Sequence, residues 1–193
     1  EPMLLSAVLP VLHSLGVQVT DERPYEIRRA DATIYLYDFG LSLPDGTLIT
    51  SEVRPHVENA FSAAWRGEAE VDGFNELVVR AGLTWRQVVV LRAYAKYLRQ
   101  AGTIYSQDYM EQTFRAYPGI AALLVALFET RFDPRLPLSD ADRARQSEEL
   151  VAAINRQLDA VTSLDQDRIL RAYLTLVRAT LRTSFFQRGP DGR

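Results

Sequence analysis

Residues 82–102 constrain the fold more than any other stretch, because they carry signals for both ends of a helix. Gln87 follows Thr84 by three places, the spacing of a capping box, and Gly102 stands where a helix ends in a left-handed residue. The apolar side chains between these ends are Val88, Val89, Val90, Leu91, Tyr94, Ala95, Tyr97 and Leu98. A helix that is apolar on nearly every side is normally surrounded by other elements. The sequence therefore predicts a helix buried among helices, with Tyr94 and Tyr97 as packing residues whose hydroxyls are paired or at the rim.

The residues before position 72 predict a small α/β module. Apolar residues at helical spacing alternate along the chain with strand-like patterns, and a turn is expected near Ala30–Asp31. Pro44, Asp45 and Gly46 predict another turn. The expected elements are a helix at 6–15, strands near 17–28 and 33–43, a helix at 53–66 and a short strand near 68–71.

From residue 72 onwards the pattern is helical. Capping residues and prolines separate the expected helices, which are 74–81, 82–102, one that Ser106 caps, one from Pro118 to Phe132, one that Ser139 caps, and one from Asp165 through Phe185. Residues 187–193 are expected to form a loop or tail. The predicted fold class is therefore α+β: a small α/β module over residues 1–71, followed by a mainly α-helical bundle over residues 72–193.

Composition argues against several functional classes. The formal net charge is -3 and the sequence pI is near 5.5, whereas nucleic-acid-binding domains are usually basic, with a pI above about 9. No apolar run approaches the roughly 20 residues that a membrane helix needs, and no export leader is recognisable. The chain has no cysteine, which excludes disulfides and thiolate sites and fits a reducing compartment.

Residue patterns for catalysis are also missing. No G-x-G occurs, so neither a dinucleotide fingerprint nor a glycine-rich phosphate loop is present. His13 and His56 are the only imidazoles and lack the convergent partners of a metal site or triad. Acidic residues in 139–150 alternate with Arg143 and Arg145, as on a solvated helix face. The sequence predicts no catalytic, cofactor-binding or metal-binding residue.

Two interpretations of the arginines stay open. Arg86, Arg92, Arg178 and Arg182 would line a groove for phosphates or an acidic partner if their helices met. In the second interpretation the long side chains cover apolar neighbours and pair with carboxylates. The acidic total favours the second.

The same central stretch carries a resemblance to a known family. DGFNELVVRAGLTWRQVVVLRAYAKYLRQAG (72–102), YSQDYMEQTF (105–114), LLVALFETRFDP (123–134) and DRILRAYLTLVRATLRTSFFQ (167–187) resemble the large bacterial NAD-specific glutamate dehydrogenases. The head, LSAVLPVLHSLGVQVTDERPYEI (5–27) with IYLYDFGL (34–41), is similar to the last ACT-like module of that family. The family-motif residues, expected to be structural, are Gly82, Trp85, Leu91, Arg92, Tyr94 and Tyr97.

The resemblance implies a non-catalytic regulatory and architectural segment of an oxidoreductase. The parent enzyme would be cytoplasmic and convert L-glutamate, NAD and water to 2-oxoglutarate, ammonia and NADH, with NAD bound outside this segment. The expected partners are the parent's catalytic domain, other subunits through the ACT-like sheet edge, and an amino-acid effector acting at the head; neither nucleic acid nor membrane is expected. An ACT module runs βαββαβ, so its first strand is expected to be missing here, and the chain is expected to end before the catalytic domain. The alternative is a self-contained helical module that binds an acidic partner or nucleic acid through the arginine groove.

Overall fold

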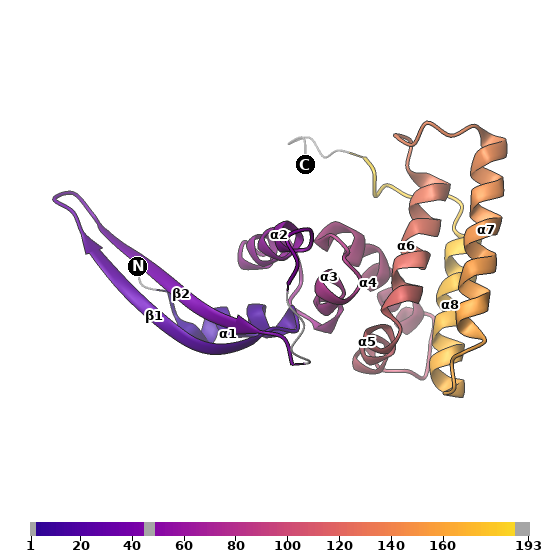
Figure 1. Ribbon diagram of the computed structural model, residues 1–193. Helices are drawn as coiled ribbons and strands as arrows, with labels where there is room; N and C mark the ends of the chain where they lie inside the picture. Colours follow the sequence, from indigo (N-terminus) through magenta and orange to yellow (C-terminus); the bar gives the residue numbers. More distant parts are fainter. Residues whose placement is uncertain (1–2, 45–48, 188–193) are drawn as a thin grey trace. The chain divides into compact units, whose positions relative to one another are not determined.

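The computed structural model describes residues 3–44 and 49–187 (Figure 1). The chain divides into two compact units, Glu1–Val89 and Val90–Arg193. The division falls inside helix α4, Trp85–Gln100. The predicted turn at 44–46 and tail at 187–193 lie almost entirely outside the described residues.

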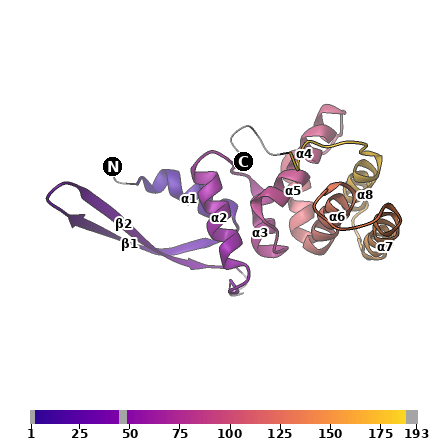
Figure 2. The same cartoon turned by 90° about the horizontal axis from the view of Figure 1, so that it is seen from above.

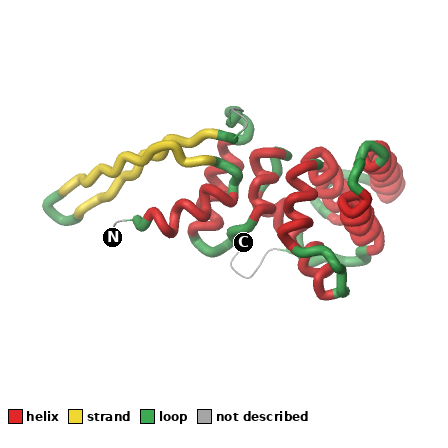
Figure 3. The backbone as a smooth tube through the Cα atoms, turned by 90° about the horizontal axis from the view of Figure 1, so that it is seen from below, coloured by secondary structure: helices red, strands yellow, loops and turns green. Residues whose placement is uncertain are grey.

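A two-stranded antiparallel hairpin forms the β portion of the first unit (Figure 3). It consists of β1, Gln18–Arg28, and β2, Thr33–Ser42, so both predicted strands are confirmed. Tyr25 pairs with Leu36 and Ile27 with Ile34, while the register shifts at a bulge between Val19 and Asp21. A bulge inserts one extra residue and increases the local twist of the strand.

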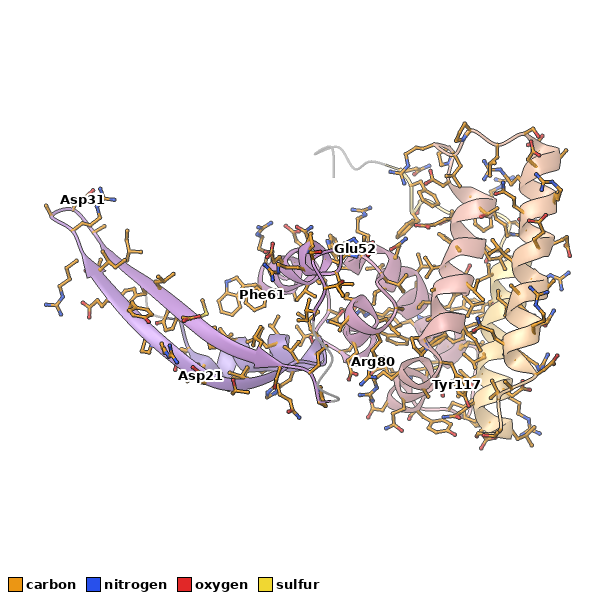
Figure 4. All side chains as sticks on the ribbon, in the orientation of Figure 1. Asp21, Asp31, Glu52, Phe61, Arg80 and Tyr117 are labelled. Atoms are coloured by element: carbon orange, nitrogen blue, oxygen red, sulfur yellow. The ribbon has the colours of Figure 1, made fainter. Side chains whose placement is uncertain are left out.

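Helix α1, Leu5–Ser14, covers one face of this hairpin near its base (Figure 2). Val8, Leu12 and Val17 form a buried cluster, against which Phe39 of the hairpin and Phe61 of the next helix pack. The Tyr37 hydroxyl accepts a hydrogen bond from the Met3 backbone N–H at 2.9 Å. Figure 4 shows Asp31 at the hairpin tip, beyond the end of α1.

Three further helical pieces complete the first unit: α2, Arg54–Trp65, the 3₁₀ helix η1, Gly73–Glu76, and α3, Leu77–Arg80. The strand expected near 68–71 is not formed; these residues make a bend and an irregular link. The backbone N–H groups of Glu68 and Ala69 donate to the Ala63 carbonyl, at 2.8 and 3.2 Å. They therefore satisfy the last turn of α2 and do not pair with a neighbouring strand.

Helix α4 begins as the sequence predicts. Gln87 Oε1 accepts from the Thr84 backbone N–H at 2.8 Å, and Thr84 Oγ1 accepts from the Gln87 N–H at 3.3 Å, which is a complete capping box. Gly102, after the helix, has a φ of +85°. The prediction that the helix is buried on nearly every side is wrong, because one stripe is exposed. This stripe consists of Arg86, Ala93, Lys96, Tyr97 and Gln100.

The second unit contains α5, Gln107–Ala116, α6, Pro118–Phe132, α7, Asp140–Leu158, and α8, Leu164–Ala179. Figure 1 shows α6, α7 and α8 running side by side. Ser106, Ser139 and Ser163 cap their helices by accepting from the backbone N–H three residues later. Tyr173 lies fully buried in the core of this unit, with its ring centroid 4.6 Å from that of Phe114.

The last helix is shorter than predicted. It ends at Ala179, and Thr180 is extended, so Leu181 and Phe185 lie outside the helix. Arg131 of α6 donates from Nη2 to the carbonyls of Arg178, at 3.1 Å, and Thr180, at 3.2 Å. This guanidinium satisfies carbonyls at the helix end that would otherwise need continued helix or water.

Candidate functional site

The outer face of the hairpin, which is turned away from α1, is apolar near the tip. Successive side chains of a strand point to opposite faces, so the cross-strand pairs Tyr25–Leu36 and Ile27–Ile34 share this face. Their exposed fractions are 48% and 54% for the first pair and 47% and 44% for the second. We call these four residues the hairpin patch. No element within the described ranges buries it, and contiguous exposed apolar surface of this kind usually marks an interaction site.

The rest of the hairpin has a different character. Towards the base, the outer face carries Asp21, Arg23 and Asp38, and Arg23 Nε lies 3.4 Å from Asp21 Oδ2. A Cβ on Gly40 would clash with Asp21 Oδ1, so glycine lets the Asp21 side chain lie across the neighbouring strand. The patch is thus confined to the half of the hairpin nearer the tip.

The six family-motif residues occupy different environments. Gly82 has a φ of +65° and its carbonyl lies 2.9 Å from His56 Nδ1. Trp85 is half-buried, Leu91 is fully buried, and Arg92 is only 3% exposed and has partners in the chain. The Tyr94 hydroxyl lies 2.7 Å from Thr180 Oγ1, as its predicted packing role requires. Tyr97 does not pack as predicted, since 56% of it is exposed.

The predicted arginine groove is not assembled as the sequence suggested. Burial of Arg92 removes it from any exposed groove. Arg182 lies beyond the end of α8 and so does not share a helix face with Arg178. Arg178 instead lines an open depression of about 510 Å³ with Arg171, whose Nε is 2.8 Å from Asp167 Oδ1. The Arg171 ion pair fits the interpretation in which arginines pair with carboxylates, whereas the Arg178 side chain has no such partner among the described residues.

Packing and hydrogen bonding shift the pKa values of several groups in the second unit. Burial raises the pKa of Tyr173 well above its usual value, and the nearby Glu111 raises it further. Burial also raises the pKa of Tyr94, although the Thr180 hydroxyl and the Arg131 charge oppose the shift. Hydrogen bonds from Arg135 hold the pKa of Asp133 below its usual value. These shifts have structural causes, which are burial for the two tyrosines and an ion pair for Asp133.

Across residues 3–44 and 49–187, no three histidine or acidic side chains cluster closely enough to hold a metal ion. Within the same ranges, no helix has the length and apolar character needed to cross a bilayer.

The hairpin patch is the feature that sequence reasoning missed. The sequence signal for the patch was the alternation of apolar residues in the two strands, Tyr25 and Ile27 in one and Ile34 and Leu36 in the other. The register of the hairpin brings these four residues to the same face.

Comparison with known proteins gives three matching family models. Residues 1–53 match the ACT3 domain of glutamate dehydrogenase, and residues 69–134 match helical motif 3 of glutamate dehydrogenase. Residues 153–193 match the catalytic domain of bacterial NAD-glutamate dehydrogenase. This last match corrects the expectation that the chain ends before the catalytic domain, because α8 and the end of α7 already fall within that model.

Full-length relatives agree with these models. The chain is 46% identical over 189 residues to an NAD-specific glutamate dehydrogenase of Mycobacterium tuberculosis, covering 94% of this chain and 12% of that protein. Proteins of the same name from Halomonas elongata and Pseudomonas aeruginosa are 43% and 41% identical, covering 100% and 99% of this chain and 12% of each protein. The chain thus spans about an eighth of the length of these relatives. It therefore belongs to the bacterial NAD-specific glutamate dehydrogenase family, as a segment of a longer protein that carries a catalytic domain.

Proposed function

We propose that the chain is a regulatory and architectural segment of an NAD-dependent glutamate dehydrogenase that acts in the cytoplasm. The parent would oxidise L-glutamate with NAD and water to 2-oxoglutarate, ammonia and NADH, with NAD bound outside residues 1–193. The names of the relatives support this reaction. The domain limits 1–71 and 72–193 remain part of the proposal, as does an amino-acid effector that acts on the ACT-like stretch.

The observation that carries the architectural role is the hairpin patch. It lies within residues 1–53, the stretch that matches the ACT3 domain. Burying one isoleucine, leucine or comparable apolar side chain completely contributes about 1.5–3 kcal/mol. The four side chains of the patch are about half exposed, so a partner that covers them would gain roughly half of this contribution from each. We propose that another subunit of the parent covers the patch. This contact lies on the face of the sheet, whereas the sequence led us to expect a contact at the sheet edge.

The patch alone is too small to hold two subunits together. A stable interface buries roughly 800 Å² on each partner, whereas four half-exposed side chains offer only a fraction of that area. The hairpin contact is therefore one of several contacts, and its loss weakens the assembly without disturbing the fold of each chain.

The test compares two variants of the full-length parent protein. Ile34→Ser with Leu36→Ser removes half of the hairpin patch, whereas Tyr35→Ser changes the residue between them, which is also exposed but lies on the opposite face. Light scattering should show that the double variant dissociates at a protein concentration at which Tyr35→Ser and the unchanged protein remain assembled. Glutamate oxidation per catalytic domain should persist in both variants. Assembly of the double variant equal to that of the unchanged protein would contradict the proposed contact.

A further inference from the structure

A small pocket opens in the first unit, at a distance from the hairpin patch along the chain. Its volume is about 210 Å³, and its lining consists of His56, Asn59, Thr84, Trp85 and Arg86. The first two residues come from α2, and the others form the start of α4. Pockets for drug-sized ligands measure about 300–1,000 Å³, so this pocket suits a smaller molecule.

His56 uses one of its two ring nitrogens in a hydrogen bond within the protein. Its Nδ1 lies 2.9 Å from the carbonyl oxygen of Gly82. Because a carbonyl oxygen only accepts, Nδ1 carries the hydrogen in this contact. Nε2 has no hydrogen-bond partner among the residues that the structure describes. The contact with Gly82 therefore fixes the imidazole and leaves Nε2, the ring nitrogen without a hydrogen, as an acceptor for a donor of a ligand.

Asn59 supplies a second polar group. It follows His56 by three residues on α2, a spacing that places both side chains on neighbouring parts of one helix face. Asn59 is exposed, and its amide has no hydrogen-bond partner within the described part of the chain. The amide nitrogen can donate two hydrogen bonds.

The start of α4 provides a cation and an apolar wall. The Arg86 guanidinium carbon lies 5.6 Å from the centre of the Trp85 ring, and Arg86 has other partners in the chain as well. A guanidinium presents donors in a planar fork that matches a carboxylate. The Thr84 hydroxyl is held by Gln87, with Thr84 Oγ1 3.0 Å from Gln87 Oε1, so this side of the pocket is fixed by the capping box.

From these groups we infer that the pocket binds a small carboxylate, of the size of a single amino acid or 2-oxo acid. The carboxylate faces the donors of Arg86 and the Asn59 amide, and the carbon skeleton of the ligand lies against the Trp85 ring. His56 Nε2, which accepts, faces a donor of the ligand such as an α-ammonium group. An inorganic anion would use the cation but would leave the indole wall without a partner. This site goes beyond the proposed function, because it requires neither a second subunit nor the hairpin.

The two tryptophans of the chain, Trp65 and Trp85, make a direct test practical. Trp65→Phe keeps an aromatic ring against Phe61, with which Trp65 stacks at 6.2 Å, and leaves Trp85 as the only indole. The 193-residue chain with this change is first checked for a cooperative thermal transition. It is then titrated with sodium L-glutamate, sodium 2-oxoglutarate and sodium phosphate at constant ionic strength, while Trp85 fluorescence is recorded.

The binding variant is Asn59→Asp, which replaces a donor with a negative charge at an exposed position. Gln18→Glu is the matched control, since it adds the same charge at another exposed site that does not line the pocket. At least one carboxylate should give a saturable fluorescence change. Asn59→Asp should raise its Kd at least about tenfold, because a like charge faces the ligand, while Gln18→Glu leaves the Kd unchanged.

Three outcomes would overturn the inference. They are the absence of a saturable change with either carboxylate, an unchanged Kd in Asn59→Asp, and phosphate binding as tightly as the carboxylates. If Asn59→Asp loses the thermal transition, Asn59→Ala takes its place. The Kd of the alanine variant must then rise several-fold, because it removes the amide donors without adding a charge.

Discussion

At the scale of single residues, Leu91 is the side chain on which α4 depends most. It has no exposed surface, and it lies on the helix side opposite the exposed stripe. Leu91→Ala should lower the free energy of unfolding by about 2–5 kcal/mol, the usual range for truncating a buried leucine. Urea denaturation followed by circular dichroism measures this loss. Tyr97→Ala, on the exposed stripe of the same helix, is the control and should change stability by less than about 0.5 kcal/mol.

Tyr173 should govern part of the response of the protein to alkaline pH. Burial holds its folded-state pKa well above the usual value of 10.0. Its stabilising contribution is therefore complete below pH 10 and is lost as the pH rises through the folded-state pKa, because only the unfolded chain ionises readily in that range. The hydroxyl is 3.9 Å from Met110 Sδ, a weak acceptor.

Tyr173→Phe removes this ionisation while keeping the ring that contacts Phe114 and Tyr94. The variant should have nearly the same stability at pH 7 and lose less stability than the unchanged chain between pH 9.5 and pH 11. Thermal melts across that range test the prediction. Parallel losses in both proteins would mean that another group dominates the alkaline response.

Leu91 and Tyr97 also show what a sequence pattern can establish about single residues. The helix around them was predictable, because Thr84 and Gln87, which cap its start, are three residues apart, and a glycine, Gly102, follows its end. How deeply Tyr97 is buried was not predictable, because a tyrosine fits a core and a rim equally well by composition. The same limit applies to Arg92, which is buried although arginine is usually exposed.

At the scale of elements, the end of α8 depends on a residue far away in the sequence. Arg131 donates to two carbonyls at that end, and its Nε is buried without a hydrogen-bond partner in the described part of the chain. Arg131→Met should destabilise the second unit by roughly 1.5–3 kcal/mol, the range for hydrogen bonds that involve a charged group. Denaturant unfolding measures the loss, and Arg178→Met is the control. No hydrogen bond or ion pair of the Arg178 side chain links it to the described residues, so its truncation should be nearly neutral.

This contact explains why the beginnings of helices were predictable and the end of α8 was not. Ser106, Ser139 and Ser163 act within three residues, so their signals are visible in the sequence. The cap of α8 comes from Arg131, 47 residues before Arg178. Local periodicity through Phe185 continued to favour a helix, and a tertiary contact overrode it. The strand predicted at residues 68–71 is absent for a similar reason, because the backbone N–H groups of Glu68 and Ala69 donate to the last turn of α2.

At the scale of the whole molecule, the sequence alone led to the α+β class and the helix–strand–strand order of the first unit. It did not locate the hairpin patch or the pocket beside Trp85, because both arise where separate segments meet. The resemblance to a family supplied what periodicity could not, namely the kind of protein to which the segment belongs. The arginine groove was an inference from helical spacing alone, and burial of Arg92 is incompatible with it.

The 193-residue chain should not oxidise glutamate on its own. Glutamate oxidation needs a site that holds a dinucleotide and places a proton acceptor beside the transferred hydride. The chain contains no G-x-G sequence, and the pKa shifts resolved among its described residues belong to tyrosines and to members of carboxylate–arginine ion pairs. Although residues 153–193 match the catalytic-domain model, they supply only the end of α7, α8 and the segment after it. The purified chain should therefore show no glutamate-dependent reduction of NAD, measured by absorbance at saturating substrate with the full-length parent as the positive control. Turnover that copurifies with the chain through two different chromatographic steps would place catalytic groups within these residues and would contradict the assignment of a regulatory and architectural role.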